Sequence, residues 1–140
     1  MLFRSLGGVE SQLASDGTNV YAAVNNLAST YTNNTEGGIK FKTPFNKGTG
    51  DIVAVNQATG KIVWDHKINQ SPYGAASLTN DVLFTTTFDG KVWAFSTKTG
   101  KTLWTAKLPA GTNTPVAIAG NTVITAGSFP QGKGDRKSVV

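Results

Sequence analysis

The acidic residues are the natural starting point, because carboxylates carry out most acid–base and metal chemistry. The chain has eight of them: Glu10, Asp16, Glu36, Asp51, Asp65, Asp81, Asp89 and Asp135. Asp16, Asp81 and Asp89 stand next to Gly or Asn or just before a β-rich run, where Asp commonly forms turns. Glu10 instead follows a Gly-Gly pair in the segment Leu6-Gly7-Gly8-Val9-Glu10. Glu10 is therefore our candidate for contact with a cofactor or other ligand.

Several kinds of active site are excluded or disfavoured by the residue counts. The chain has one histidine, His66, and no cysteine, so a zinc site or a Ser-His-Asp triad is not expected. We expect His66 to have a surface or turn role. Gly48-Thr49-Gly50 precedes a predicted strand rather than a helix, so it is not a phosphate-binding loop. We assign no catalytic residue and no metal ligand from the sequence.

Charge and hydropathy limit the partners. The net charge is +5 and the isoelectric point is about 9.6, but the lysines are scattered and no basic stripe alternates with aromatic residues. A nucleic-acid surface is therefore not expected. The one basic cluster, Lys133, Arg136 and Lys137, lies near the end of the chain. The sequence has no run of about 18 apolar residues, so it predicts no membrane-spanning helix.

An internal repeat of 40 residues organises the chain. Residues 50–68 and 90–108 share seven of 19 aligned positions, among them Ala54/Ala94, Gly60/Gly100 and Trp64/Trp104. Residues 78–85 and 118–125 match at the same offset in their apolar and turn positions. Such self-similarity is typical of repeat architectures.

An earlier copy begins at Asp16-Gly17-Thr18-Asn19-Val20, and its spacing to the next copy contains extra residues within 25–49. This segment is rich in Asn, Thr, Gly and Lys, and we interpret it as a long loop inserted into a repeat. Two roles are open for it, a solvated surface loop or one wall of a substrate entrance. The residues that would shape such an entrance are Tyr31, Glu36, Lys40, Phe41 and Lys42. Asn33-Asn34-Thr35 also fits a glycosylation sequon.

Each repeat is predicted to contain four short antiparallel strands. Val82–Phe88 is a β-rich run, and the Asp89-Gly90 pair that follows indicates a hairpin into Lys91–Phe95. Thr99-Gly100-Lys101 supplies the next turn, before a strand over Thr102–Leu108. Four strands in about 40–45 residues form the blade of a β-propeller. The fold class is therefore all-β, a propeller fragment of about two and a half to three blades.

The motif Ala-x4-Thr-Gly-Lys-x2-Trp occurs at residues 54–64 and 94–104. Its indole is expected to lie against the next blade, where the N–H needs a hydrogen-bond acceptor. Trp93 falls outside the motif and is expected to pack within its blade. The motif resembles the tryptophan-docking motif of the quinoprotein (PQQ-binding-like) propeller repeat family. Asn56 and Ser96 stand where that family commonly has Asp, and both still offer an oxygen to the turn.

The resemblance covers roughly residues 7–128 and is greatest for the branch of PQQ-dependent alcohol and polyvinyl-alcohol dehydrogenases. It implies that the chain is part of a PQQ-dependent oxidoreductase acting on alcohols or similar substrates. PQQ and Ca²⁺ would then bind to the full-length protein, in the periplasm or outside the cell, and none is expected in this fragment. The same repeats build non-catalytic assembly scaffolds, so a binding scaffold is the alternative function.

We divide the chain into blades as follows: 1–68 with the insertion at 25–49, 69–108, the start of a third blade at 109–128, and a tail or first strand residues at 129–140. This would be the C-terminal part of a larger propeller. A lone fragment would expose two blade faces, so the expected partners are the missing blades or other copies of the chain. We expect the fragment itself to be inactive.

Overall fold

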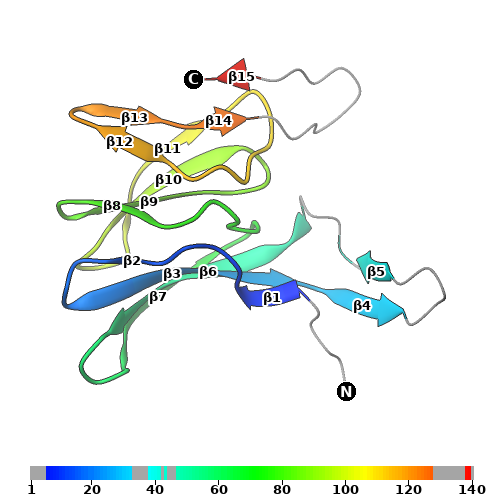
Figure 1. Ribbon diagram of the computed structural model, residues 1–140, viewed down its shortest axis with the longest axis horizontal. Coiled ribbons are helices and arrows are strands. Elements are labelled where there is room, and N and C mark those ends of the chain that lie inside the picture. Colours follow the sequence, from blue (N-terminus) through cyan, green and yellow to red (C-terminus); the bar gives the residue numbers. More distant parts are fainter. Residues whose placement is uncertain (1–5, 33–37, 42, 44–46, 128–137, 140) are drawn as a thin grey trace.

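The computed structural model describes residues 6–32, 38–41, 43, 47–127 and 138–139, whose strands form one five-stranded, one four-stranded and three two-stranded antiparallel sheets. Apart from one two-stranded sheet, they lie side by side as three layers (Figure 1). The layers follow one another in chain order. The all-β class and the unit of four antiparallel strands are confirmed. Within the described part, the chain forms no helix that is long and apolar enough to cross a membrane.

The first sheet contains a blade whose innermost strand is broken in two. Its order is β1-β3-β6-β7, and β2 also pairs with β3. Strand β1 pairs with residues 24–27 of β3 and β2 with residues 20–21, so β1 and β2 share one side of β3. The bounds are β1 Leu6–Val9, β2 Ala14–Ser15, β3 Asn19–Leu27, β6 Thr49–Asn56 and β7 Ile62–Ile68.

The second sheet has the order β11-β10-β9-β8. Its strands are β8 Ser77–Thr79, β9 Val82–Thr86, β10 Lys91–Ser96 and β11 Thr102–Lys107. Strand β9 ends two residues earlier than the predicted Val82–Phe88, because Thr87 and Phe88 already belong to the turn.

The third layer is described only in its inner half. It consists of two separate two-stranded sheets, β12 (Ala117–Ala119) with β13 (Thr122–Ile124), and β14 (Ala126–Gly127) with β15 (Ser138–Val139). In β15, Val139 lies opposite Ala126. The residue 40 positions before Ala126 is Thr86, and it lies opposite Val92 of β10. Strand β15 therefore stands where the third strand of this blade begins.

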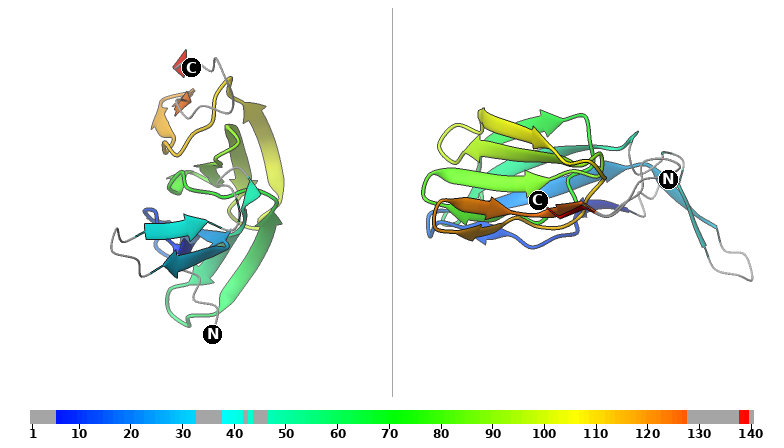
Figure 2. Two further views of the ribbon diagram at one scale, coloured as in Figure 1. Left: turned by 90° about the vertical axis from the view of Figure 1, so that its right-hand side faces the viewer. Right: turned by 90° about the horizontal axis from the view of Figure 1, so that it is seen from above.

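The insertion is not a plain loop. Strand β3 runs to Leu27 and β6 starts at Thr49, and between them β4 (Ser29–Thr32) pairs with β5 (Gly38–Phe41). This hairpin projects beyond the end of the sheets (Figure 2). A segment rich in Thr with Tyr and Phe has the β-propensity to pair, which composition alone had not indicated. Glu36, Lys42, the sequon, and the basic residues Lys133, Arg136 and Lys137 lie outside the described residues.

Two hydrophobic clusters fill the spaces between neighbouring sheets. The first joins strands β3, β6 and β7 to strands β9 and β10 through buried residues that include Tyr21, Ile52, Leu83 and Phe95. The second lies between the second and third sheets and includes Phe84, Ala94 and Val116. Each sheet is thus a layer that buries its faces only against its neighbours, as expected for blades.

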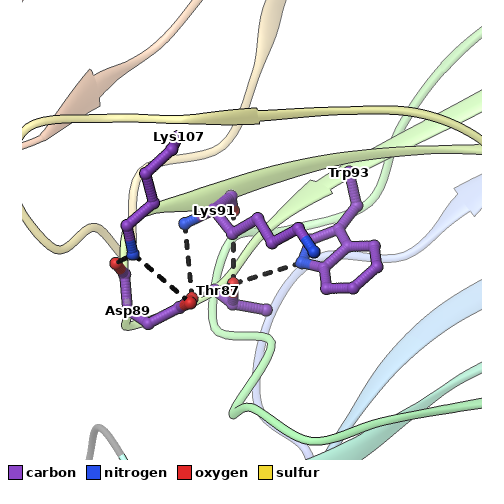
Figure 3. A network of polar contacts seen from close by, with 5 residues as sticks. All are labelled: Thr87, Asp89, Lys91, Trp93 and Lys107. Carbon is purple, nitrogen blue, oxygen red and sulfur yellow. Dashed lines mark hydrogen bonds and ion pairs between the residues drawn. The ribbon is translucent and has the colours of Figure 1, made fainter.

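The predicted Asp-Gly turn after β9 is held by a polar network (Figure 3). Asp89 Oδ1 accepts hydrogen bonds from Thr87 Oγ1 at 2.6 Å and from the Lys91 backbone N–H at 3.3 Å. Lys107 Nζ lies 3.4 Å from Asp89 Oδ2. Trp93 Nε1 donates to Thr87 Oγ1 at 3.2 Å, with Lys91 Nζ 3.8 Å from its ring. Trp93 stacks on Phe95 of its own strand, with 5.8 Å between ring centroids, and it also packs against the cluster shared with the first sheet.

Candidate functional site

The first strands of the three sheets lie together, and they define an inner edge. Strand β8 contacts both β2 and β12. The backbone N–H of Ala76, just before β8, donates to the Gln12 carbonyl at 3.1 Å, and Ser77 Oγ donates to the Val116 carbonyl at 2.6 Å. In a ring of blades this edge faces the central axis, where propeller ligands bind.

Glu10 lies at the break in the inner strand. Pairing with β3 stops at Val9 and resumes at Ala14, so Glu10 is outside the ladder and exposed. Gly8 has φ +104°, a conformation that glycine adopts at little cost. The Gly-Gly pair thus lets the strand turn out of the sheet and present Glu10 at the inner edge.

Tyr73 approaches Glu10 from the connection between the first and second blades. Its ring packs edge-on against Phe88, with 4.6 Å between ring centroids, and the Phe88 N–H donates to the Ser71 carbonyl at 3.1 Å. Burial, followed by the charge and the hydrogen bonding of Glu10, raises the pKa of Tyr73 to about 12. The phenol therefore stays protonated near neutral pH beside a carboxylate.

Two glycines allow the connection to lie directly on the first blade. A Cβ on Gly48 would be 1.9 Å from Ser71 Oγ, and one on Gly50 would be 2.3 Å from Pro72 Cδ. No larger residue fits at either position without a shift of the connection. The residues 70–74 are thus brought to the end of β3 and the start of β6.

Buried polar side chains collect at this contact. Asn25 is fully buried, and it sits in register between Gly8 and Gly50 on the neighbouring strands. Among the residues that the structure describes, neither atom of its amide has a hydrogen-bond partner, and the same holds for Ser71 Oγ, Gln70 Oε1 and Ser11 Oγ. Unpartnered buried polar groups are rare in folded proteins. Together with Glu10 and Tyr73 they form what we call the inner-edge cluster.

The structure places the predicted site residues in different environments. Glu10 is at the inner edge, and its role in cofactor binding stays a prediction. Asp16 and Asp89 cap turns as expected: Asp16 Oδ1 accepts from the backbone N–H groups of Thr18 and Asn19 at 2.8 and 2.7 Å. His66 is not a turn residue, since it lies within β7 with its ring 4.9 Å from that of Phe95. Asp135 is outside the described residues.

Sequence reasoning missed Asn25, Gln70, Ser71 and Tyr73. One signal was present for Asn25: it interrupts the apolar face of β3 that carries Tyr21, Ala23 and Leu27. The other three lie on an irregular connection, where no periodicity distinguishes a buried position from an exposed one.

The repeats also match a known family. Residues 48–136, more than half of the chain, match the family model described as "Outer membrane protein assembly factor BamB". The chain belongs to this PQQ-type propeller repeat family. The resemblance drawn from the tryptophan motif is thereby confirmed.

Curated relatives of this PQQ-type chain are dehydrogenases by name. It is 34% identical over 79 residues to the quinoprotein alcohol dehydrogenase PedE of Pseudomonas putida, and 32% identical over 79 residues to a quinoprotein ethanol dehydrogenase of Pseudomonas aeruginosa. It is 38% identical over 65 residues to a lanthanide-dependent methanol dehydrogenase of Methylorubrum extorquens. These matches cover 46% to 56% of the chain but only 11% to 13% of the relatives.

Solved structures of the PQQ-type family show the same fold. A europium-containing methanol dehydrogenase superposes with a TM-score of 0.64 at 18% identity, covering 86% of this chain and 24% of that one. The BamB of Moraxella catarrhalis superposes with a TM-score of 0.52 at 18% identity, covering 84% of this chain and 42% of that one.

The described residues do not complete a site for PQQ or Ca²⁺. Calcium takes roughly six to eight oxygen ligands, several of them carboxylates. The inner-edge cluster offers one carboxylate, Glu10, beside neutral oxygens. In the part of the chain that the structure covers, no three His, Cys, Asp or Glu residues come together. Any complete cofactor site would need side chains from beyond this cluster.

Proposed function

We propose that this chain is a section of a PQQ-dependent oxidoreductase acting on alcohols or similar substrates. The observation that carries the proposal is the inner-edge cluster, in which Glu10, beside Tyr73, is presented toward the axis of a PQQ-type propeller. The dehydrogenase names of the curated relatives support the reaction class. The same relationship supports a periplasmic or secreted location.

In this proposal the chain supplies only part of the site. Glu10 provides one carboxylate, Tyr73 holds it through a protonated hydroxyl, and the buried amide and hydroxyl groups bind polar atoms of a ligand. The remaining ligands and the flat apolar surface that a quinone needs come from other blades. The 140-residue chain alone is therefore expected to be inactive.

The test is dye-linked oxidation of primary alcohols by the longer protein that contains this chain, supplied with PQQ and either Ca²⁺ or a lanthanide. Turnover is expected with one of the metals, and Glu10→Gln should lower it by about 10–100-fold, because the site loses a carboxylate that holds the cofactor or metal. Asp65→Asn, a change at an exposed carboxylate on an outer strand, is the matched control and should leave turnover unchanged.

A non-catalytic scaffold is the second candidate. It is favoured by the description of the matching family and by the single carboxylate of the inner-edge cluster. If neither PQQ binding nor turnover is found with either metal, the oxidoreductase proposal is wrong and the scaffold stands.

A further inference from the structure

Tyr73 belongs to a connection that has no strand pairing of its own. The connection runs from Ile68, the last residue of β7, to Ser77, the first residue of β8. Within it the Tyr73 N–H donates to the Ser71 carbonyl at 3.2 Å, which closes a turn of only three residues. A turn this small leaves the rest of the connection free to move unless another element holds it. The position of the Tyr73 hydroxyl beside Glu10 therefore depends on contacts from outside the connection.

The residue that follows Tyr73 must be a glycine. A Cβ on Gly74 would lie 1.9 Å from Thr86 Oγ1 and 2.8 Å from the Thr86 backbone nitrogen. Glycine has more backbone freedom than any other residue, so Gly74 does little by itself to fix the direction of the chain. The close packing that requires a glycine thus also requires another source of rigidity.

Strand β9 supplies that rigidity through two hydrogen bonds to Gly74. The Gly74 N–H donates to the Thr86 carbonyl at 3.1 Å, and Thr85 Oγ1 donates to the Gly74 carbonyl. The first bond fixes the peptide group before Gly74, and the second fixes the peptide group after it. Because Thr85 is 1% exposed, water has little access to compete for the carbonyl. Both backbone torsions of Gly74 are therefore held by β9.

The hydroxyl of the neighbouring threonine holds a different connection. Thr86 Oγ1 donates at 2.7 Å to the carbonyl of Thr114, which stands 40 residues after Gly74 in the repeat. Thr125, which stands 40 residues after Thr85, donates to the same Thr114 carbonyl at 3.5 Å. Successive side chains of a strand point to opposite faces of its sheet. Thr85 thus serves the connection that precedes the second blade, and the Thr86 hydroxyl serves the connection that follows it.

We propose that Thr85 is a positioning residue of the inner-edge cluster. Through its hydrogen bond to the Gly74 carbonyl, it holds the hydroxyl of Tyr73 against the Glu10 carboxylate. Without this bond the peptide group after Gly74 can rotate, and the Tyr73 hydroxyl spends less time beside Glu10. The effect of Thr85 on turnover rests on the proposed function, whereas its effect on Tyr73 does not.

The test measures how strongly Glu10 influences Tyr73 in the 140-residue chain, with and without the Thr85 hydroxyl. Tyrosines are replaced by 3-fluorotyrosine, whose phenol ionises at lower pH, and Tyr73→Phe assigns the Tyr73 resonance in the fluorine NMR spectrum. With Thr85 present, Glu10→Gln should lower the pKa of Tyr73, because the carboxylate raises it. In Thr85→Val, which removes the hydroxyl at nearly equal volume, the effect of Glu10→Gln should fall to about half or less. Thr85→Ser keeps the hydroxyl and should restore the full effect.

Thr86→Val is the matched control, because it removes an equally buried hydroxyl from the next position of β9. It should lower the urea midpoint about as much as Thr85→Val does and leave the effect of Glu10 on Tyr73 unchanged. Circular dichroism at each pH verifies the fold, and Thr85→Ala provides the same test if valine is not accommodated. The proposal is wrong if the effect of Glu10→Gln persists in full without the Thr85 hydroxyl, or if Thr86→Val reduces that effect equally.

Dye-linked oxidation by the longer protein separates this proposal from the proposed function. If the longer protein oxidises alcohols, Thr85→Val should lower turnover about tenfold, as loss of a residue that orients a ligand-binding group does, and Thr85→Ser should not. Full turnover in Thr85→Val would overturn the positioning role. If the longer protein shows no turnover at all, the proposed function fails, and the fluorine titration alone decides whether Thr85 positions Tyr73.

Discussion

Trp64 and Trp104 occupy the same place in consecutive repeats, yet their surroundings differ. Trp64 is half-buried and donates to the Thr97 carbonyl at 2.7 Å, whereas Trp104 is 51% exposed. The expected docking of the indole on the next blade is thus seen for the first tryptophan and not for the second. The difference arises because the described part of the third blade lacks the strand and turn that would receive Trp104.

Trp64→Phe is expected to destabilise the chain by about 1–3 kcal/mol, because the buried Thr97 carbonyl loses its donor. Trp104→Phe is the matched control, and it should change the free energy of unfolding by less than about 0.5 kcal/mol. Urea unfolding of the two variants measures both values. Equal losses would contradict the docked role of Trp64.

Tyr73 makes the stability of the chain depend on pH in the alkaline range. The pKa of Tyr73 is raised from 10.0 to about 12, mainly by burial and then by Glu10. Unfolded chains lose this proton first, so the stabilising contribution is complete below pH 10 and disappears as pH rises to about 12. Tyr21, whose pKa burial also raises, adds to the same trend.

The free energy of unfolding should therefore fall between pH 10 and about 12. In the variant Tyr73→Phe the slope should be smaller, with Tyr21 supplying the remainder. Glu10→Gln should lower the pKa of Tyr73 without returning it to 10.0, since burial remains. The absorbance of tyrosinate during an alkaline titration measures the pKa of Tyr73. An unchanged titration curve in Glu10→Gln would show that Glu10 does not influence Tyr73.

At the scale of elements, two turns with the same sequence pattern have different structural roles. Gly60 and Gly100 close equivalent turns with φ of +68° and +67°. A Cβ on Gly60 would meet nothing within 4 Å, while one on Gly100 would overlap the Trp64 ring. The first glycine serves only its own turn, and the second also serves the contact between blades.

Gly60→Ala should cost about 1–2 kcal/mol, which is the price of a left-handed conformation for a residue with a Cβ. Gly100→Ala should cost about 1–3 kcal/mol more, because the methyl group overpacks the indole. Chemical denaturation of the two variants gives the difference. A difference near zero would mean that the blades separate easily at this contact.

The inserted hairpin is the element on which prediction was least complete. An unequal spacing between repeats located it within 25–49, and the structure adds the β4–β5 pairing. Its part in a substrate entrance stays a prediction, and the side chains of Tyr31, Lys40 and Phe41 lie outside those described.

At the scale of the whole molecule, one face of the first sheet is uncovered by the described residues, and it carries apolar side chains beside Asp51, Asp65 and Lys67. Val9, Val24, Val53, Val55 and Ile62 share this face through the strand register. Val9 is 50% exposed and Ile62 is 64% exposed. Exposed apolar side chains on an uncovered sheet face favour association, which the net charge of +5 opposes only in part.

The 140-residue chain is therefore expected to self-associate as its concentration rises, as measured by sedimentation velocity. Ile62→Lys should reduce the association by placing a charge in the apolar face. Ala58→Lys, which adds the same charge in an exposed turn, should not. A chain that stays monomeric with a sharp thermal transition would contradict the exposed-face argument.

The sequence by itself determined the repeat, the four-strand unit, the Asp-Gly turn and the family. These depend on residues close together in the chain, where alternating side chains and turn formers act locally. Only the tertiary structure decided that Gly100 lies under Trp64, that Tyr73 meets Glu10, and that Asn25 is buried beside Gly50. Those contacts join residues 25 to 63 positions apart. Asn25 meets Gly50 because β3 pairs with β6, and the other two contacts form only where the second sheet and its connection stack on the first, which no local pattern specifies.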